Sequence, residues 1–330
     1  MKPCVFTGSA AAIVTPFRNG AVDLPAFDRL VEWQLRRGTD AIVVCGTTGE
    51  AATLSLDERT VLIEHCVRIA DGRVPVIAGS GTNSTASSVA LSRAAQSAGA
   101  DALLTVTPYY NKASQSGLVR HFSAIADAVD IPVILYNVPS RTGVSCTAQT
   151  YQKLAAHPNI AGVKEASDDF DLIQDTLALC PADFTLWSGN DGSTAAIMAL
   201  GGRGVISVAA NIVPREMHEL TQLCLSGSFP EAARLQLRLH ALIRALFCEV
   251  NPIPVKAAME HLGLCSSELR LPLCAISEQN RTRLTCAMED FGVAGATTLC
   301  TAAATYGLIA GSMMGGPIGK MLIERHHLLD

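Results

Sequence analysis

Aromatic and charged residues are both scarce in this chain of 330 residues. Phe, Trp and Tyr make up 5% of the sequence, and Asp, Glu, Lys and Arg make up 17%, with a net charge of −5. This acidic balance argues against a nucleic-acid-binding protein, because such binding needs a basic face that neutralises phosphates. The 49% of hydrophobic residues provide enough apolar surface for a large core, which excludes a disordered chain and a small disulfide-stabilised one.

Cysteines with metal-binding or redox spacing are also missing. The eleven Cys residues contain no CxxC pair, and the nearest His and Cys residues match no metal-ligand spacing. We therefore predict no metal site. An odd number of scattered thiols is typical of a reducing compartment, and the first residues lack the apolar stretch of a signal peptide. We accordingly expect a cytoplasmic protein.

Short apolar runs, by contrast, recur about every 30 residues, which is the spacing of a strand–helix unit. They do not alternate with polar residues, so they indicate strands that are buried on both faces. Amphipathic stretches of helical length separate them. Eight such strands close most economically as a (β/α)8 TIM barrel; an open doubly wound sheet is the alternative, although its glycine fingerprint is absent. The runs span residues 11–14, 41–44, 74–77, 102–106, 131–135, 160–163, 184–187 and 204–208.

The chain changes in character after about residue 210. Residues 214–291 have a helical pattern, which predicts a small C-terminal helical domain. We expect a catalytic barrel over residues 1–227, the helical domain over 228–294 and an atypical extension over 295–330. Residues 291–319 contain seven Gly and no charge. They are long enough to span a membrane, but their Gly, Ala and Thr content makes insertion only marginally favourable; a docked tail is the alternative.

Hydroxyl, phenol, amine and guanidinium groups follow the ends of several predicted strands. In a parallel barrel these ends share one mouth, where reactive groups gather. No His and no pair of free carboxylates dominates this set, which disfavours metal hydrolysis and a Ser-His-Asp triad. The composition favours carbonyl chemistry through an imine. The residues are Thr47, Thr48, Tyr109, Tyr110, Tyr136, Arg141 and Lys164.

Lys164 is the candidate nucleophile, because it alone among the six Lys residues lies at the end of an apolar run. Burial there would disfavour the ammonium form, and attack on a ketone requires a neutral amine. The alternative is a structural lysine at a strand end that pairs with Glu165 or Glu50.

Seven segments of the chain together resemble the dihydrodipicolinate synthase family of pyruvate-dependent Schiff-base aldolases, in the family's order and spacing over residues 1 to about 294. The resemblance implies a lyase that condenses pyruvate with L-aspartate 4-semialdehyde in diaminopimelate and lysine biosynthesis. It implies no cofactor beyond the covalent Schiff base, and a homotetramer built as a dimer of dimers. The segments are residues 6–9, 46–50, 105–111, 135–143, 162–166, 201–208 and 251–256.

The resemblance also implies a catalytic role for four residues. Lys164 would form the Schiff base with pyruvate, and Tyr136 would shuttle protons during imine formation and deprotonation. Thr47 would link Tyr136 to Tyr110 in a hydroxyl relay, with Tyr110 reaching in from the neighbouring subunit. Such a relay suits the reaction, because protons leave and return at each imine step.

Four further residues are implied to bind the substrates. Thr48 would hold the pyruvate carboxylate, and Arg141 would bind the carboxylate of the aldehyde through its bidentate guanidinium. Gly189 and Ile206 would contribute backbone groups to the pocket. A sister aldolase that uses the same imine, such as N-acetylneuraminate lyase or a 2-keto-3-deoxy sugar acid aldolase, is the alternative. A non-catalytic barrel that acts as a binding or membrane-tethered module is a third interpretation.

The feedback site of the family is incomplete in this sequence. Many bacterial members bind L-lysine at a subunit interface, and Asn83 and Tyr109 match that allosteric site. Leu56 and Arg59 stand where the family often has His, and Ser87 stands where an acidic residue binds the amine of the inhibitor. Because a lost carboxylate partner weakens binding of an ammonium, we predict weak or absent inhibition by lysine.

The tail departs from the family, whose members end near residue 294. Residues 303–311 and 315–317 resemble a fragment of a sodium/glutamate symporter. If the tail spanned a membrane, its basic residues would favour the cytoplasmic side and place the barrel outside, away from its metabolites. We therefore interpret the tail as a non-native extension or a fusion remnant, and we do not expect a membrane protein.

Overall fold

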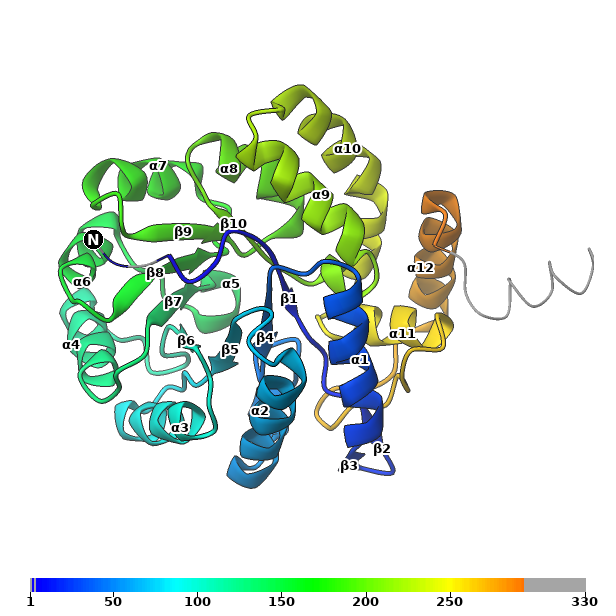
Figure 1. Cartoon of the computed structure of the whole chain (residues 1–330), viewed down its shortest axis with the longest axis horizontal. Coiled ribbons are helices and arrows are strands. Elements are labelled where there is room, and N and C mark those ends of the chain that lie inside the picture. The colour runs from blue at the N-terminus through cyan, green and yellow to red at the C-terminus, as the bar shows by residue number, and fades with distance from the viewer. Residues whose placement is uncertain (1, 3, 294–330) are drawn as a thin grey trace, which may run out of the picture.

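The chain forms a closed barrel of eight parallel strands (Figure 1) in a computed structural model that describes residue 2 and residues 4–293. Each strand pairs with its neighbours in chain order, and β1 closes the barrel by pairing with both β4 and β10. This confirms the predicted TIM barrel and rules out the open sheet. The strands are β1 (Gly8–Ala12), β4 (Ala41–Val44), β5 (Val76–Gly79), β6 (Ala102–Val106), β7 (Val133–Asn137), β8 (Ile160–Glu165), β9 (Thr185–Ser188) and β10 (Gly204–Ser207), and a short hairpin, β2 (Phe17–Arg18) and β3 (Ala21–Val22), follows β1.

Helices connect successive strands and cover the outside of the barrel. Polar caps fix where several of them begin, as in the capping box of α2, where Ser55 and Glu58 each bond the backbone N–H of the other. The connecting helices are α1 (Leu24–Arg36), η1 (Ala51–Thr53), α2 (Leu56–Ala70), α3 (Thr85–Ser97), α4 (Gln115–Ala126), α5 (Pro139–Thr142), α6 (Ala148–Ala155), α7 (Phe170–Leu179), η2 (Asp191–Ser193), α8 (Thr194–Ala199), η3 (Ala209–Asn211) and α9 (Pro214–Leu225).

Within residues 4–293, three helices follow the barrel, as the sequence pattern predicts: α10 (Phe229–Leu246), α11 (Ile253–His261) and α12 (Glu278–Phe291). In Figure 1 α11 and α12 lie at the same side of the barrel as α1, and α12 packs against α10 and α11. The predicted extension over residues 295–330 lies outside the described residues. Within the described part of the chain, no helix is both long and apolar enough to cross a membrane.

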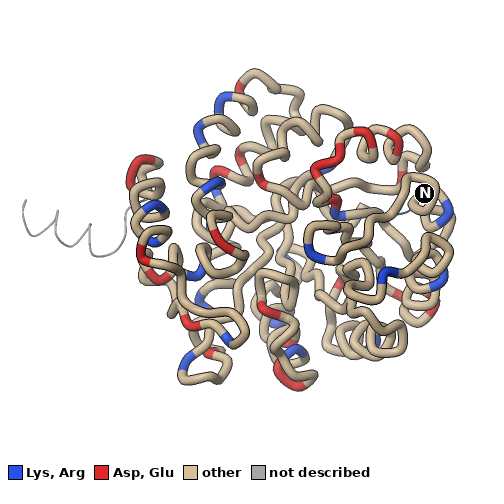
Figure 2. Tube along the Cα trace, turned by 180° about the vertical axis from the view of Figure 1, so that it is seen from behind, with Lys and Arg blue, Asp and Glu red and all other residues tan. Residues whose placement is uncertain are grey.

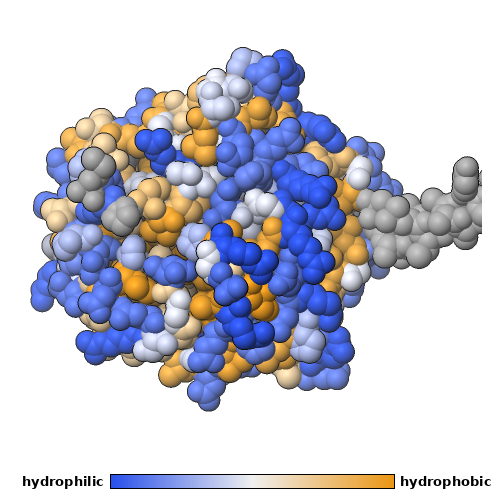
Figure 3. Space-filling model, viewed as in Figure 1, coloured by the Kyte–Doolittle hydropathy of each residue, from blue (hydrophilic) through white to orange (hydrophobic). Residues whose placement is uncertain are grey.

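The core consists of two apolar layers. One fills the inside of the barrel and includes the stacked rings of Phe6 and Trp187, and the other lies between the strands and the surrounding helices. The strand residues are almost all buried, as expected for strands covered on both faces. Acidic and basic residues are interspersed on the outer helices (Figure 2), and hydrophilic residues cover much of the face seen in Figure 3.

Candidate active site

Lys164 and Tyr136 lie side by side at the ends of neighbouring strands. They are paired in the register of β8 and β7, and the Lys164 Nζ lies 4.2 Å from the centroid of the Tyr136 ring. Tyr136 belongs to the apolar cluster inside the barrel. The two residues are only 6% and 7% exposed. The strands therefore present an amine and a phenol to the same buried space at the barrel mouth.

The two carboxylates that were the alternative partners of Lys164 are both engaged elsewhere. Because side chains alternate along a strand, Glu165 points to the other face of β8, where it accepts a hydrogen bond from the Tyr151 hydroxyl at 2.8 Å. Glu50 forms an ion pair with Lys256 at 2.7 Å. The interpretation of Lys164 as a lysine paired with Glu165 or Glu50 is therefore wrong.

A tight turn after β4 carries Thr47 and Thr48. It is closed by a hydrogen bond of 3.1 Å from the Glu50 N–H to the Thr47 carbonyl, and Glu50 has a left-handed φ of 53°. The buried Thr48 hydroxyl accepts a hydrogen bond of 3.0 Å from the Asn251 side-chain amide. The turn thus carries two adjacent hydroxyl groups, and the Thr48 hydroxyl is held in place by Asn251 from the C-terminal region.

Arg141 lies in the one-turn helix α5 that follows β7, with its side chain exposed. Its guanidinium donates to the Asn251 carbonyl at 3.1 Å. Asn251 therefore bridges Arg141 and Thr48, the two residues expected to bind carboxylates. Sequence reasoning assigned Asn251 no role, although its segment was among those that carried the family resemblance.

Of the remaining predicted pocket residues, Gly189 directly follows β9 and Ile206 lies on β10. The Gly189 N–H donates to the Glu165 carbonyl at 2.7 Å, and a Cβ at Gly189 would lie 2.5 Å from the Cβ of Ala166. Only glycine allows this close approach of the backbones. Ile206 is fully buried in the cluster inside the barrel, together with Tyr136.

Asp191, just after β9, is a buried carboxylate that sequence reasoning missed. Its Oδ2 accepts the backbone N–H groups of Val208 and Ala209. Burial raises the pKa of Asp191, while these hydrogen bonds, one with the Ser207 hydroxyl and the charge of Lys164 act in the opposite direction. No motif marked this residue, because its backbone partners follow a different strand.

A cavity of about 360 Å³ opens at the barrel mouth. Its lining includes Thr47, Tyr109, Tyr136 and Arg141, whereas Lys164 and Thr48 are not among the lining residues. Tyr110 does not line it: the side chain is 89% exposed, and its backbone has a left-handed φ of 74°. Within the described residues, no three His, Cys, Asp or Glu side chains come together to hold a metal ion.

Two of the five positions compared with the family's lysine site line the same cavity. Arg59 and Tyr109 both line it, and the Arg59 guanidinium donates to the carbonyls of Ala51 and Gly79. Asn83, the other residue that matches the family's lysine site, accepts a hydrogen bond at its carbonyl from the Asn111 side chain.

Comparison with known proteins identifies the relatives of this chain. The model of the dihydrodipicolinate synthetase family matches residues 5–290, and a sodium/glutamate symporter model matches residues 284–330. A 4-hydroxy-tetrahydrodipicolinate synthase from Geobacter sulfurreducens is 51% identical over 287 residues, covering 87% of this chain and 99% of the relative. The enzyme of the same name from Acetivibrio thermocellus is 46% identical over 293 residues, covering 89% of this chain and all of the relative.

Solved structures agree with these matches. The dihydrodipicolinate synthase of Aquifex aeolicus is 45% identical with a TM-score of 0.87, covering 88% of this chain and all of that one. The chloride-inhibited enzyme of Acinetobacter baumannii, complexed with pyruvate, is 45% identical with a TM-score of 0.85, covering 87% of this chain and 99% of that one. The barrel, the buried lysine and these matches lead to one conclusion: the chain belongs to the dihydrodipicolinate synthetase family.

Proposed function

We propose that this chain is a lyase that condenses pyruvate with L-aspartate 4-semialdehyde to give 4-hydroxy-tetrahydrodipicolinate. The observation that carries the proposal is the buried amine of Lys164 beside the ring of Tyr136, which lines the cavity together with Thr47 and Arg141. The shared name of the curated relatives supports the same reaction. The substrate itself forms the covalent link, so the reaction needs no separate cofactor.

The first half of the reaction joins pyruvate to Lys164. The neutral amine attacks the keto carbon, and one proton moves from the amine to the keto oxygen. A second proton from the relay then converts this hydroxyl into the water that leaves, which gives an iminium. Loss of a proton from the methyl group then gives an enamine. Tyr136, adjacent to Nζ, is the proposed group that passes these protons, with Thr47 as the next hydroxyl of the relay.

In the second half the enamine carbon attacks the aldehyde of the semialdehyde. We assign the pyruvate carboxylate to Thr48 and the carboxylate of the second substrate to Arg141, whose planar guanidinium suits a carboxylate. This guanidinium also favours the proposed reaction over a sister aldolase for sugar acids, because a sugar acceptor presents hydroxyl groups in place of a short carboxylate.

A shared active site is part of the proposal. Tyr110 is 89% exposed on the single chain, and an exposed phenol next to a left-handed turn is free to enter the site of a second copy. The proposed relay is then complete only in a dimer or a larger assembly such as a dimer of dimers.

The ten described cysteines are all free thiols, which supports the proposed location in the cytoplasm.

The proposal is tested by trapping the covalent intermediate. The full chain is treated with borohydride in the presence of pyruvate, the modified peptide is mapped by mass spectrometry, and the enzyme is then assayed with a series of aldehyde acceptors. We expect a reduced pyruvyl adduct on Lys164 and turnover with aspartate semialdehyde. The absence of an adduct, or an adduct on Lys256, contradicts the proposal, and turnover with a sugar aldehyde alone favours the sister aldolase.

A further inference from the structure

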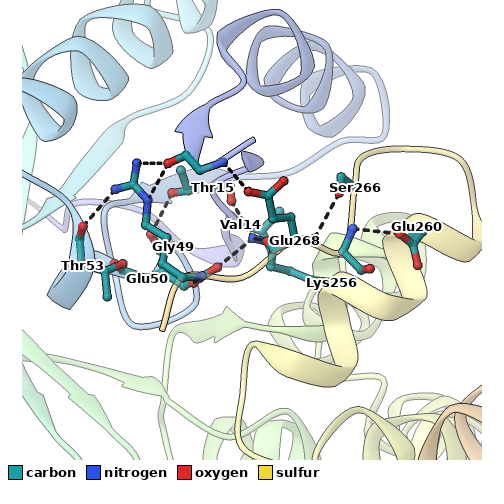
Figure 4. Close-up of polar contacts among 12 residues, drawn as sticks. Val14, Thr15, Gly49, Glu50, Thr53, Lys256, Glu260, Ser266 and Glu268 are labelled. Atoms are coloured by element: carbon teal, nitrogen blue, oxygen red, sulfur yellow. Dashed lines mark hydrogen bonds and ion pairs between the residues drawn. The ribbon is translucent and has the colours of Figure 1, made fainter. Parts of the chain in front are cut away.

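A second buried lysine is bonded to Glu50, which lines the cavity. Lys256, on α11, is fully buried, and its Nζ donates to the Glu50 carboxylate at 2.7 Å, the Thr15 carbonyl at 3.0 Å and the Glu268 carbonyl (Figure 4). The Nζ also lies 4.4 Å from the centroid of the Phe17 ring. An ammonium has three protons to donate, and all three have acceptors here. Burial lowers the pKa of Lys256, while the charge and hydrogen bond of Glu50 act in the opposite direction, and the three contacts hold the Nζ in place.

The anion of this pair ends the turn that carries the threonines. The Glu50 N–H donates to the Thr47 carbonyl, and one carboxylate oxygen binds Lys256 while the other accepts the Arg270 N–H at 3.1 Å. Glu50 is 4% exposed. A single carboxylate thus fastens the end of the turn to α11 and to the segment that follows α11.

The residues just before Glu50 are held in the same way. The Thr15 hydroxyl donates to the Gly49 carbonyl at 2.7 Å, and the Asn251 side chain donates to the Thr48 hydroxyl. Figure 4 shows Thr15, Gly49, Glu50 and Lys256 meeting from separate segments of the chain. Three consecutive residues of the turn are therefore fixed by contacts with distant parts of the sequence.

We propose that the buried Glu50–Lys256 ion pair is a positioning device that holds the Thr47–Thr48 turn in the geometry that binds the carboxylate of the keto acid. This inference rests on the proposed function, since it takes Thr48 as the carboxylate-binding residue. A buried ion pair contributes little net stability compared with apolar residues of similar volume. We expect the ion pair to act instead by fixing the orientation of the turn, because a binding site requires supporting residues that hold its contact groups in place.

The test compares Lys256→Met, Glu50→Gln and the double variant with the wild-type chain. The readout is the pyruvate concentration that gives half-maximal borohydride trapping at Lys164, which needs no aldehyde substrate. We expect this concentration to rise about tenfold or more in each single variant. Because the two charges act as one unit, the double variant should show a rise close to that of one single variant.

Thermal unfolding of each variant separates positioning from general stability. The double variant buries no unpaired charge, so it reports on positioning even if a single variant does not fold. Arg281→Met is the matched control, because it removes a partly exposed ion pair between α12 and Glu260, which lies on the same helix as Lys256, and it should leave trapping unchanged. A folded double variant with the half-saturating pyruvate of the wild type overturns this inference alone, whereas a wild-type chain that is not trapped overturns the proposed function as well.

Discussion

Replacing Thr48 with Val removes one hydroxyl and keeps the shape of the side chain. The hydroxyl is buried and accepts a hydrogen bond from the Asn251 amide at 3.0 Å. In the proposed site it also binds a charged carboxylate. A hydrogen bond to a charged group contributes about 1.5–3 kcal/mol, which corresponds to pyruvate binding that is about 10- to 150-fold weaker. The unpartnered Asn251 amide should also lower the free energy of unfolding by about 1–3 kcal/mol.

Two measurements check this prediction. Steady-state kinetics should show a higher KM for pyruvate, with a smaller change in the KM for aspartate semialdehyde. Urea unfolding should show the loss of stability. Thr60→Val is the matched control, because the Thr60 hydroxyl donates only to a carbonyl of its own helix, Leu56. A pyruvate KM within twofold of the wild type in a folded Thr48→Val variant would refute the assignment of the carboxylate to this hydroxyl.

Three further predictions concern the second substrate, the inhibitor and the response to acid. Arg141→Lys replaces a bidentate fork by a point charge, so kcat/KM for the semialdehyde should fall about 10- to 100-fold while pyruvate trapping persists; equal losses for both substrates would contradict this. L-lysine should inhibit weakly or not at all because of Ser87, and half-inhibition well below the millimolar range would show otherwise. The hydrogen bonds from Arg270 lower the pKa of Glu58 from 4.5 to about 2. The wild-type chain should therefore be more stable than Glu58→Gln above pH 4.5, and this difference in stability should disappear as the pH falls toward 2. Urea unfolding at several pH values measures the free energy of unfolding of both chains. A difference between them that does not change with pH would refute the Arg270–Glu58 hydrogen bonds as its cause.

The barrel was predictable because its signal is local. A strand such as β4 is buried on both faces and is therefore apolar throughout, and each of the eight predicted runs overlaps a strand. The predicted and observed limits differ at β1: the strand covers Gly8–Ala12, whereas the predicted run covers residues 11–14. Ile13 and Val14 are buried beyond the end of the strand, so apolar character continues past the regular ladder.

The contacts of Asn251 and Lys256 were not predictable from local pattern. Lys256 lies in an apolar helical stretch, and its counter-ion Glu50 is 206 residues away. Asn251 joins Thr48 and Arg141, which are 203 and 110 residues away. Propensity and periodicity describe neighbours along the chain, so they identified the turn and the arginine but not the residue that connects them.

The two buried lysines show how the same side chain serves two purposes. Each Nζ lies over an aromatic ring, Tyr136 for Lys164 and Phe17 for Lys256, at 4.2 and 4.4 Å. The Lys256 Nζ makes further contacts with one carboxylate and two carbonyls. For Lys164, no carboxylate within the described part of the chain forms an ion pair. The acceptors around Lys256 occupy all three of its donor positions, and we therefore assign the proposed imine to Lys164.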